Sequence, residues 1–318
     1  MNTVLLTDYA WPDTAIEAQV LGDAGLALVC GPSVPGTAAE VAALARQARP
    51  AAILTCWAPV RADAIAAAQP LRMVGRMGVG LDNIDVETCT QRGILVTNVP
   101  DYCVEEVSDH ALGLVLAWTR GIATLADQTR RGSWNPAGAR LRRLSALSVG
   151  IVGYGRIGRR TAAKLAPWGC RVLVHSRGAV ADAAVQAVSL DELLARCDIV
   201  VIHAPLTDAT QGLFDGARLA KMKRGALLVN VSRGGIVDSA ALAEALASGH
   251  LGGAALDVVD TEPAVAAALR EHPNALITPH VAFSSDASLA ELRRRACEEV
   301  VRVLAGLPAH HPCNAVAA

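Results

Sequence analysis

The sequence predicts an α/β protein with two doubly wound domains, each a parallel sheet covered by helices. Short apolar runs alternate with amphipathic stretches from the first residues to about Cys313, the usual pattern of parallel strands joined by helices. At ~150 residues per domain, a chain of 318 residues has room for two domains. A polar, glycine-containing segment, Arg130–Arg143, separates two series of these runs. We therefore expect two compact units, each with its own core.

The first series predicts five strands separated by alanine-rich helices, of which Thr37–Arg49 is an example. The expected strands are Val4–Leu6, Ala27–Cys30, Ala52–Thr55, Met73–Arg76 and Ile94–Val96. A longer helical pattern then extends from Val104 to Arg120, with Leu112, Val115 and Leu116 on one face. This helix is a candidate link between the two domains.

The second series contains six expected strands and ends in a helix. The strands are Val149–Val152, Cys170–Val174, Ile199–His203, Ala226–Val231, Ala254–Val258 and Ala275–Ile277. The last helix, Ala287–Leu304, has one apolar stripe, formed by Leu289, Leu292, Ala296, Val300 and Val303. Because this stripe needs a partner, we expect the helix to pack against another part of the protein.

Composition limits the classes of partner. The formal net charge is −1, and acidic and basic residues are mixed along the chain, so we expect neither a nucleic-acid-binding face nor a polybasic membrane tail. No apolar run approaches the ~20 residues that span a bilayer, and the start lacks a basic signal-peptide region. These observations favour a cytoplasmic protein whose partners are small neutral or anionic metabolites.

The eight cysteines form no Cys-x-x-Cys pair and no Cys/His spacing typical of a metal site. We expect them to be reduced and mostly buried, and we expect no bound metal. Cys103 lies in the polar stretch Asp101–Glu106, so it is either a small buried side chain or an accessible thiol.

One glycine-rich segment carries a dinucleotide-binding pattern. The strand Val149–Val152 runs directly into Gly153-Tyr-Gly155-Arg156-Ile157-Gly158, and a helix and a second strand follow. In such a loop the first glycine allows the tight turn, the second lets the backbone approach the pyrophosphate, and the third lets the helix pack closely. The helix N-terminus then faces the anion. The pattern in this context predicts a Rossmann-like dinucleotide site.

The end of the next strand bears on which dinucleotide binds. A carboxylate there would accept hydrogen bonds from the ribose 2′-hydroxyl of NAD, but this chain has His175-Ser176-Arg177. A serine hydroxyl and a guanidinium can hold the 2′-phosphate of NADP, which a carboxylate would repel. The sequence therefore favours NADP(H), with NAD(H) as the alternative.

Three further segments place polar residues after apolar strands. Arg233 follows the strand that ends near Asn230, Asp257 and Glu262 follow the next strand, and His280 follows the last one. Since ligands bind at the carboxyl ends of parallel strands, we expect these side chains to converge.

Together with Gly78-Val79-Gly80-Leu-Asp82-Asn-Ile-Asp85, these motifs resemble the D-isomer-specific 2-hydroxyacid dehydrogenase family. Within this family, the sequences of three segments, Arg76–Asp85, Asn98–Pro100 and Val104–Glu106, are most similar to those of C-terminal-binding proteins and D-3-phosphoglycerate dehydrogenases. The resemblance covers nearly the whole chain. It implies a dinucleotide-binding domain, 98–283, inserted in a flavodoxin-like substrate-binding domain, 1–97 plus 284–318, and it implies a homodimer.

The resemblance also implies roles for single residues in hydride transfer between a nicotinamide dinucleotide and a small 2-oxo or 2-hydroxy acid. Arg233 would bind the substrate and stabilise charge on its carbonyl oxygen, and His280, paired with Glu262, would be the general acid/base. The backbone N–H groups of Val79 and Gly80 would bind the substrate carboxylate. The cofactor would contact, besides the glycine loop, Ser176 and Arg177, the residues Ala204, Pro205, Thr210, Val231, Ser232, Arg233, Asp257 and His280.

The substrate itself stays open at this point. Phosphoglycerate dehydrogenases share an arginine after the third strand, where this chain has Thr55-Cys56-Trp57. Arg76, in contrast, matches a second arginine of those enzymes, one that contacts the phosphate. Trp57 is either a wall of the substrate pocket or a core residue. An alternative function on the same fold is a dinucleotide-sensing binding protein that acts through partners, as corepressors do.

Overall fold

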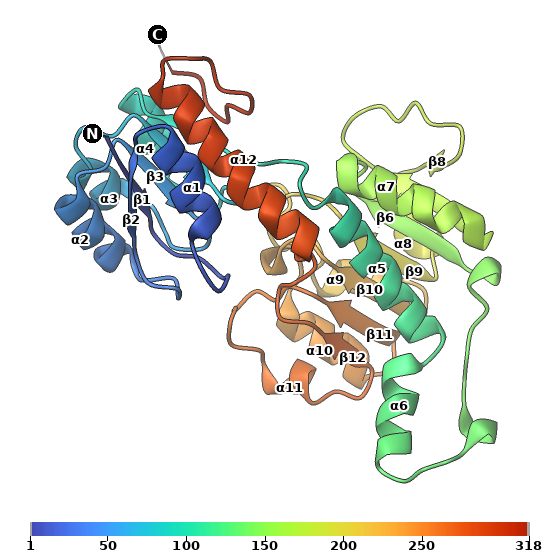
Figure 1. Cartoon of the computed structure of the whole chain (residues 1–318). Coiled ribbons are helices and arrows are strands. Elements are labelled where there is room, and N and C mark those ends of the chain that lie inside the picture. The colour runs from blue at the N-terminus through green and yellow to red at the C-terminus, as the bar shows by residue number, and fades with distance from the viewer. Residues whose placement is uncertain (1, 317–318) are drawn as a thin grey trace. The chain divides into compact units, whose positions relative to one another are not determined.

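The structure is a computed structural model that describes residues 2–316 (Figure 1). The chain forms two compact units, one made of Met1–Tyr102 and Ser285–Ala318 and the other of Cys103–Ser284. Both units contain an all-parallel sheet, five-stranded in the first and seven-stranded in the second. The predicted α/β class with two doubly wound sheets is therefore confirmed.

The first unit has strand order β2-β1-β3-β4-β5. The order in which successive strands are added therefore reverses between β1 and β3, although all the strands are parallel. Ligands of doubly wound sheets bind beside such a reversal, at the carboxyl ends of the strands. The strands lie close to the predicted ranges: β1 (Thr3–Leu6), β2 (Ala27–Cys30), β3 (Ala52–Thr55), β4 (Met73–Arg76) and β5 (Leu95–Thr97).

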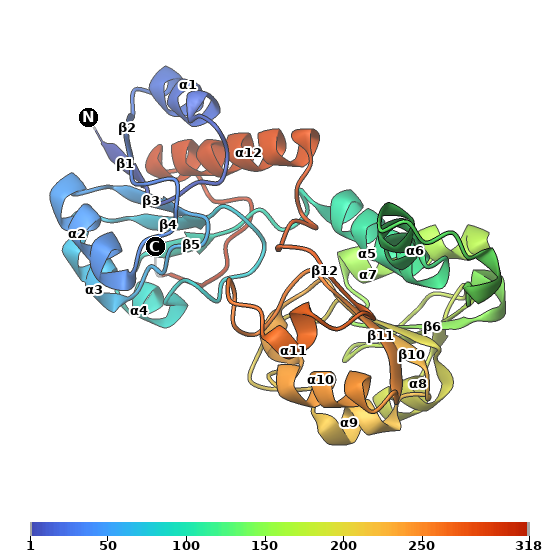
Figure 2. The same ribbon diagram turned by 90° about the horizontal axis from the view of Figure 1, so that it is seen from below.

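Helices cover both faces of this sheet, as Figure 2 shows. One face carries α2 (Ala38–Ala48), α3 (Ala62–Ala67) and α4 (Val86–Gln91), and the other carries α1 (Ala15–Asp23) and α12 (Asp286–Leu304). The last helix packs against α1 and β4, so it returns to the N-terminal unit as the family resemblance implied. Its buried face also holds a charged pair, in which Arg293 Nε and Nη2 donate to the two Glu17 carboxylate oxygens at 2.8 and 2.7 Å.

The second unit has strand order β12-β11-β10-β9-β6-β7-β8, with its reversal between β6 and β9. The strands are β6 (Ser148–Val152), β7 (Arg171–His175), β8 (Gln186–Ala187), β9 (Ile199–Ile202), β10 (Ala226–Asn230), β11 (Leu251–Leu256) and β12 (Ala275–Ile277). The two-residue edge strand β8 was not predicted, because both of its side chains are exposed and carry no apolar signal.

Helices also cover both faces of the second sheet. They are α5 (Val104–Thr119), α6 (Ile122–Arg130), α7 (Arg156–Leu165), α8 (Leu190–Arg196), α9 (Gly216–Lys221), α10 (Ser239–Ala247) and α11 (Ala267–Arg270). Single 3₁₀ turns are η1 (Pro136–Gly138), η2 (Leu144–Ala146), η3 (Ala166–Trp168) and η4 (Gly234–Ile236). Helix α5 belongs entirely to this unit and packs on α7, so the expectation that it links the domains is wrong.

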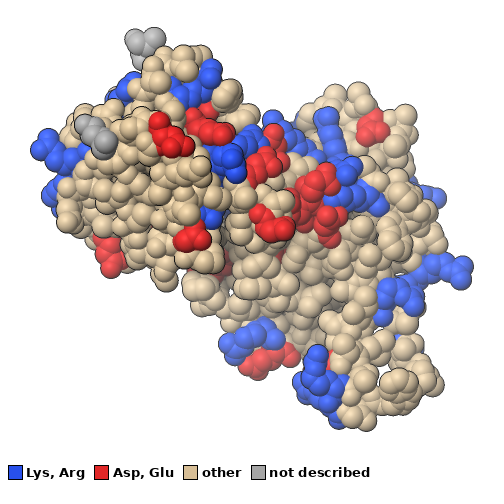
Figure 3. All heavy atoms as spheres, viewed as in Figure 1, with Lys and Arg blue, Asp and Glu red and all other residues tan. Residues whose placement is uncertain are grey.

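Charged side chains of both signs lie next to one another on the face drawn in Figure 3. Many of them form ion pairs, such as Lys164 with Glu105 at 3.0 Å and with Asp109 at 2.7 Å. In residues 2–316 no helix is both long and apolar enough to cross a membrane. Cys103 is 3 % exposed, which favours the interpretation of this residue as a small buried side chain.

Candidate active site

The predicted catalytic residues follow three neighbouring strands, β10, β11 and β12. The loops after β10 and β11 touch at Gly234, where a Cβ atom would lie 1.9 Å from the carbonyl carbon of Val259. Only glycine fits there, because any side chain would overlap that backbone. This close approach of the two backbones places Arg233 in the chain segment directly beside the loop that carries Glu262.

Glu262 connects the second loop to the third. Its Oε1 accepts a hydrogen bond from Val259 N at 3.1 Å, and its Oε2 lies 2.7 Å from His280 Nδ1. Since an ionised carboxylate only accepts, Nδ1 carries the proton of this bond. The other ring nitrogen, Nε2, is then the one available to exchange a proton with a reacting group, and the side chain of His280 is 26 % exposed.

Arg233 lies in a loop that Asn230, the last residue of β10, holds in place. Asn230 Nδ2 donates to Arg233 O at 2.9 Å, and Ser232 N donates to Asn230 Oδ1 at 3.0 Å. Arg233 Nη1 donates to Ser232 O at 2.8 Å, and the residue is half-buried. The backbone around this guanidinium is therefore fixed before any ligand binds, which favours precise recognition of a carboxylate.

The glycine loop after β6 has the geometry that a dinucleotide needs. Gly153 has φ 100°, and a Cβ atom there would lie 2.5 Å from Ala204 N. A Cβ atom on Gly158 would lie 2.1 Å from Gly153 O, so helix α7 packs as close as the motif requires. Gly155 has no atom within 4 Å of a built Cβ, which leaves the loop open on that side. Arg156 and Ile157 begin α7, so its N-terminus faces this opening and the residues fit a pyrophosphate.

The remaining predicted cofactor residues lie at the ends of β7, β9, β10 and β11. Ser176 and Arg177 follow β7, the first half-buried and the second exposed. Ala204 and Pro205 follow β9, and Thr210 closes their loop by donating to Pro205 O at 2.7 Å. Val231 and Ser232 follow β10, and Ser232 Oγ donates to Ile202 O at 3.1 Å. Asp257 follows β11 and is 2 % exposed.

Two side chains near this loop were not predicted to matter. Tyr154, inside the glycine motif, donates its hydroxyl to Asp182 Oδ2 at 2.6 Å, and this bond and one from Ala184 N lower the pKa of Asp182. His203, at the end of β9, lies 2.9 Å from Thr161 Oγ1, and burial lowers its pKa to about 3. Asp182 therefore places a carboxylate in the same loop as Ser176, and His203 is neutral.

The predicted substrate residues belong to the first unit. The buried Asp8, after β1, accepts hydrogen bonds from Cys56 N at 3.1 Å and from Trp57 N at 2.7 Å, which fixes the loop after β3. Asp8 thus orients the half-buried Trp57 at the point where the strand order reverses. The turn at Val79 and Gly80 is held by Asn98, whose Nδ2 donates to Val79 O at 2.7 Å.

Arg76, the last residue of β4, is 9 % exposed. Its Nη1 donates to Met77 O, and a Cβ atom on Gly78 would lie 2.5 Å from that same nitrogen. The guanidinium therefore packs against the backbone that leads into the Val79–Gly80 turn.

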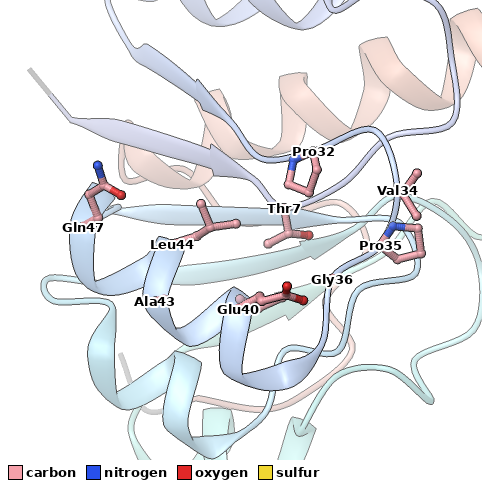
Figure 4. Close-up of a pocket in the computed structure, with 10 residues that line it drawn as sticks. Thr7, Pro32, Val34, Pro35, Gly36, Glu40, Ala43, Leu44 and Gln47 are labelled. Carbon is pink, nitrogen blue, oxygen red and sulfur yellow. The ribbon is translucent and has the colours of Figure 1, made fainter.

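A separate hollow of about 500 Å³ lies in the first unit, between α2 and the loops after β1 and β2 (Figure 4). It is lined by Thr7, Pro32, Val34, Pro35, Gly36, Glu40, Val41, Ala43, Leu44 and Gln47. None of these is a predicted site residue, and the Glu40 carboxylate is already bonded to Thr37 N and Oγ1 in a capping box. Among residues 2–316 no group of three or more His, Cys, Asp and Glu side chains could hold a metal ion.

A seven-stranded doubly wound sheet with this glycine loop is typical of a dinucleotide-binding domain, and a glutamate–histidine pair lies at its neighbouring strand ends. The model of the D-isomer specific 2-hydroxyacid dehydrogenase NAD-binding domain matches residues 112–282. The chain belongs to the D-isomer-specific 2-hydroxyacid dehydrogenase family, as its motifs predicted.

Known relatives and structures agree with this assignment. D-3-phosphoglycerate dehydrogenase of Mycobacterium bovis is 41% identical over 245 residues, which are 76% of this chain and 46% of that protein. The chain thus spans about half the length of the curated relatives it matches. A solved structure from Thermus thermophilus is 34% identical with a TM-score of 0.91, covering 98% of this chain and 100% of that one.

A third similar protein is the NADPH-dependent glyoxylate/hydroxypyruvate reductase of Sinorhizobium meliloti, solved with NADP and malonate. It is 29% identical to this chain with a TM-score of 0.87, and the match covers 98% of this chain and 96% of the reductase.

Proposed function

We propose that this protein transfers a hydride between a nicotinamide dinucleotide and C2 of a small 2-oxo or 2-hydroxy acid. The bond of 2.7 Å between Glu262 Oε2 and His280 Nδ1 is the observation that carries the proposal. It fixes the tautomer and the orientation of the imidazole, as the third group of a catalytic array does. Bound beside the glycine loop, the cofactor supplies or accepts the hydride.

The protein's own residues then bind the acid and move a proton. Arg233 binds the substrate carboxylate and stabilises the negative charge that develops on the carbonyl oxygen during reduction. His280 Nε2 gives this oxygen its proton, and in the oxidative direction the same nitrogen accepts the proton of the 2-hydroxyl group. Glu262 stabilises the imidazolium form in both directions.

Further parts of the proposal concern the cofactor and the substrate. Ser176 and Arg177 favour NADP(H) over NAD(H), and the similar reductase from S. meliloti is NADPH-dependent. The backbone at Val79 and Gly80 binds the substrate carboxylate, and Trp57 forms one wall of the site for the substrate's side chain. Trp57 is uncharged and lies in the segment where phosphoglycerate dehydrogenases have an arginine. An uncharged or aromatic 2-oxo acid therefore suits this wall better than a phosphorylated one.

The test is turnover of a panel of acids with both cofactors. Glyoxylate, hydroxypyruvate and an aryl-pyruvate are offered with NADPH or NADH, and D-3-phosphoglycerate with NADP or NAD. We expect reduction of at least one 2-oxo acid well above background. If no acid is turned over while NADPH or NADH binds, the alternative of a dinucleotide-sensing binding protein takes its place.

The catalytic role of His280 is tested on the best substrate of this panel. His280→Ala should lower kcat by ~10²–10⁴-fold, the usual contribution of general acid–base catalysis. Glu262→Gln should lower kcat less, because the amide oxygen can still accept from His280 Nδ1, although the amide has no second acceptor for Val259 N and no charge to stabilise the imidazolium. Near-normal kcat in His280→Ala, under conditions where chemistry limits the rate, would refute this role.

A further inference from the structure

His280 has a backbone conformation that is rare for its residue type. Its φ is 52°, in the left-handed region that favours glycine. Of the described non-glycine residues, Arg49 is the other with a positive φ, and it is the C-cap of α2, where this conformation is common. His280 does not end a helix. Its conformation must therefore be held by contacts outside the turn.

Asp257 provides several of these contacts. Its side chain is 1 % exposed, and its two carboxylate oxygens accept hydrogen bonds from Val281 N at 3.0 Å and from Ala282 N at 2.8 Å. Its backbone oxygen accepts a third bond from His280 N at 2.8 Å. One buried residue at the end of β11 thus binds three consecutive N–H groups of the turn that contains His280.

Thr278 and His110 extend this set of bonds. Thr278 Oγ1 lies 2.6 Å from Asp257 Oδ1, and His110 Nε2 lies 3.0 Å from Thr278 Oγ1. An ionised carboxylate only accepts, so the hydroxyl proton of Thr278 points to Asp257. The hydroxyl oxygen then accepts, and His110 must present a protonated Nε2. The order of the bonds is from His110 to Thr278 and from Thr278 to Asp257.

We propose that His110 is a positioning residue for His280, acting through Thr278 and Asp257. His110 lies on α5, which packs on β10 and β11, so a rigid helix supports the turn from the side of the sheet (Figure 1). The Nε2 atom of His110 bonds to Thr278 and belongs to none of the groups that we place on substrate or cofactor. The expected effect on kcat rests on the function proposed above. The mechanical link, by which His110 holds the turn through Thr278 and Asp257, does not depend on that function.

Three substitutions separate this role from a general effect on stability. His110→Ala removes the donor, His110→Gln offers an amide N–H near the position of Nε2, and His110→Asn offers the same amide one methylene short. We expect kcat to fall about tenfold in His110→Ala and His110→Asn, with KM and the dissociation constant of NADPH within about twofold of wild type, because small misplacements of a catalytic group are costly. His110→Gln should recover most of kcat.

The mechanical link is measured without substrate or cofactor, by hydrogen–deuterium exchange of the peptide that contains residues 278–284. Exchange at Val281 and Ala282 should be faster in His110→Ala and His110→Asn, and close to wild type in His110→Gln. Thr278→Val should match His110→Ala, and Thr278→Ser should match wild type, which keeps the test intact if one variant folds poorly.

The outcomes distinguish the two proposals. Unchanged exchange and unchanged kcat in His110→Ala overturn the positioning role. A loss of kcat that His110→Gln does not restore also overturns it, because the donor would then not be the cause. Faster exchange in a protein whose wild type reduces no 2-oxo acid supports the link and refutes the proposed function.

Discussion

The proposal for the end of β7 assigns cofactor selection to two residues, Ser176 and Arg177. Ser176→Asp should repel a 2′-phosphate, and Arg177→Ala should remove a charge-assisted bond to it. Such a bond contributes ~1.5–3 kcal/mol, or roughly ten- to a hundredfold in relative affinity. We therefore expect each variant to shift the ratio of kcat/KM for NADPH and NADH toward NADH by about that factor.

The matched control is Arg171→Ala, an exposed arginine at the opposite end of the same strand, which should leave the ratio unchanged. Asp182 gives the experiment a second arm, because Tyr154 holds its carboxylate in the loop after β7. The wild type could prefer NADH, with a preference that Arg177→Ala leaves intact and Asp182→Asn reverses. That result would show that Asp182, rather than Ser176 and Arg177, discriminates between NADPH and NADH.

The residues of the candidate site were predictable to different degrees. The bond between Glu262 and His280 joins two residues that both follow apolar strands, so their convergence could be expected from topology. His110 lies 168 residues before Thr278. The apolar pattern of its helix predicts that the helix packs against the protein, but it does not predict a bond to Thr278. Similarly, nothing local links Tyr154 to Asp182, 28 residues later. Pairs that form only through tertiary contact leave no periodic signal in the sequence.

Among the elements, the apolar strands were predictable, including β2 and β12, which contain no fully buried residue. All four residues of β3 and of β9 are buried, and their predicted ranges agree with the structure to within a residue. Helix α6 was not predicted, and none of its residues is buried. Helix α12 was predicted from its apolar residues, but its buried Arg293 and Glu299 were not expected on that face.

Those charged residues are buried because each has a partner from elsewhere in the first unit. Arg293 pairs with Glu17, and Glu299 Oε1 accepts from His310 N at 2.6 Å and from His311 N at 3.0 Å. A buried charge needs such partners, since burial alone would be costly. Polar residues on an apolar face thus become predictable only when the partner is known.

Leu292 tests how much the returning helix stabilises the first unit. It is 1 % exposed on the α12 face that packs on α1 and β4. Leu292→Ala should lower the free energy of unfolding by ~2–5 kcal/mol, because a buried leucine leaves a cavity. Glu298→Ala, an exposed change on the same helix, should alter it by less than ~0.5 kcal/mol. Equal urea midpoints for the two variants would contradict a stabilising role for this face.

For the whole molecule, the homodimer that the family resemblance implies needs an apolar surface where the subunits meet. Three of the large exposed apolar side chains belong to one segment of the second unit, 122–141: Ile122 is 56 % exposed, Trp134 is 85 % exposed and Leu141 is 40 % exposed. A Cβ atom on Gly121, the N-cap of α6, would lie 3.1 Å from Leu141, so this side chain lies beside the start of that helix. We expect these exposed side chains to form part of the subunit interface, where aromatic and other large apolar residues are enriched.

We therefore expect the protein to elute with twice its chain mass of 32.9 kDa in light-scattering chromatography. The double variant Ile122→Arg, Trp134→Arg should dissociate at low micromolar concentration, because two buried unpaired charges oppose association. Val34→Arg changes a side chain that is 68 % exposed in the first unit, and it should remain dimeric. A wild-type monomer would refute the homodimer, and a double variant as dimeric as Val34→Arg would show that the interface lies on another surface.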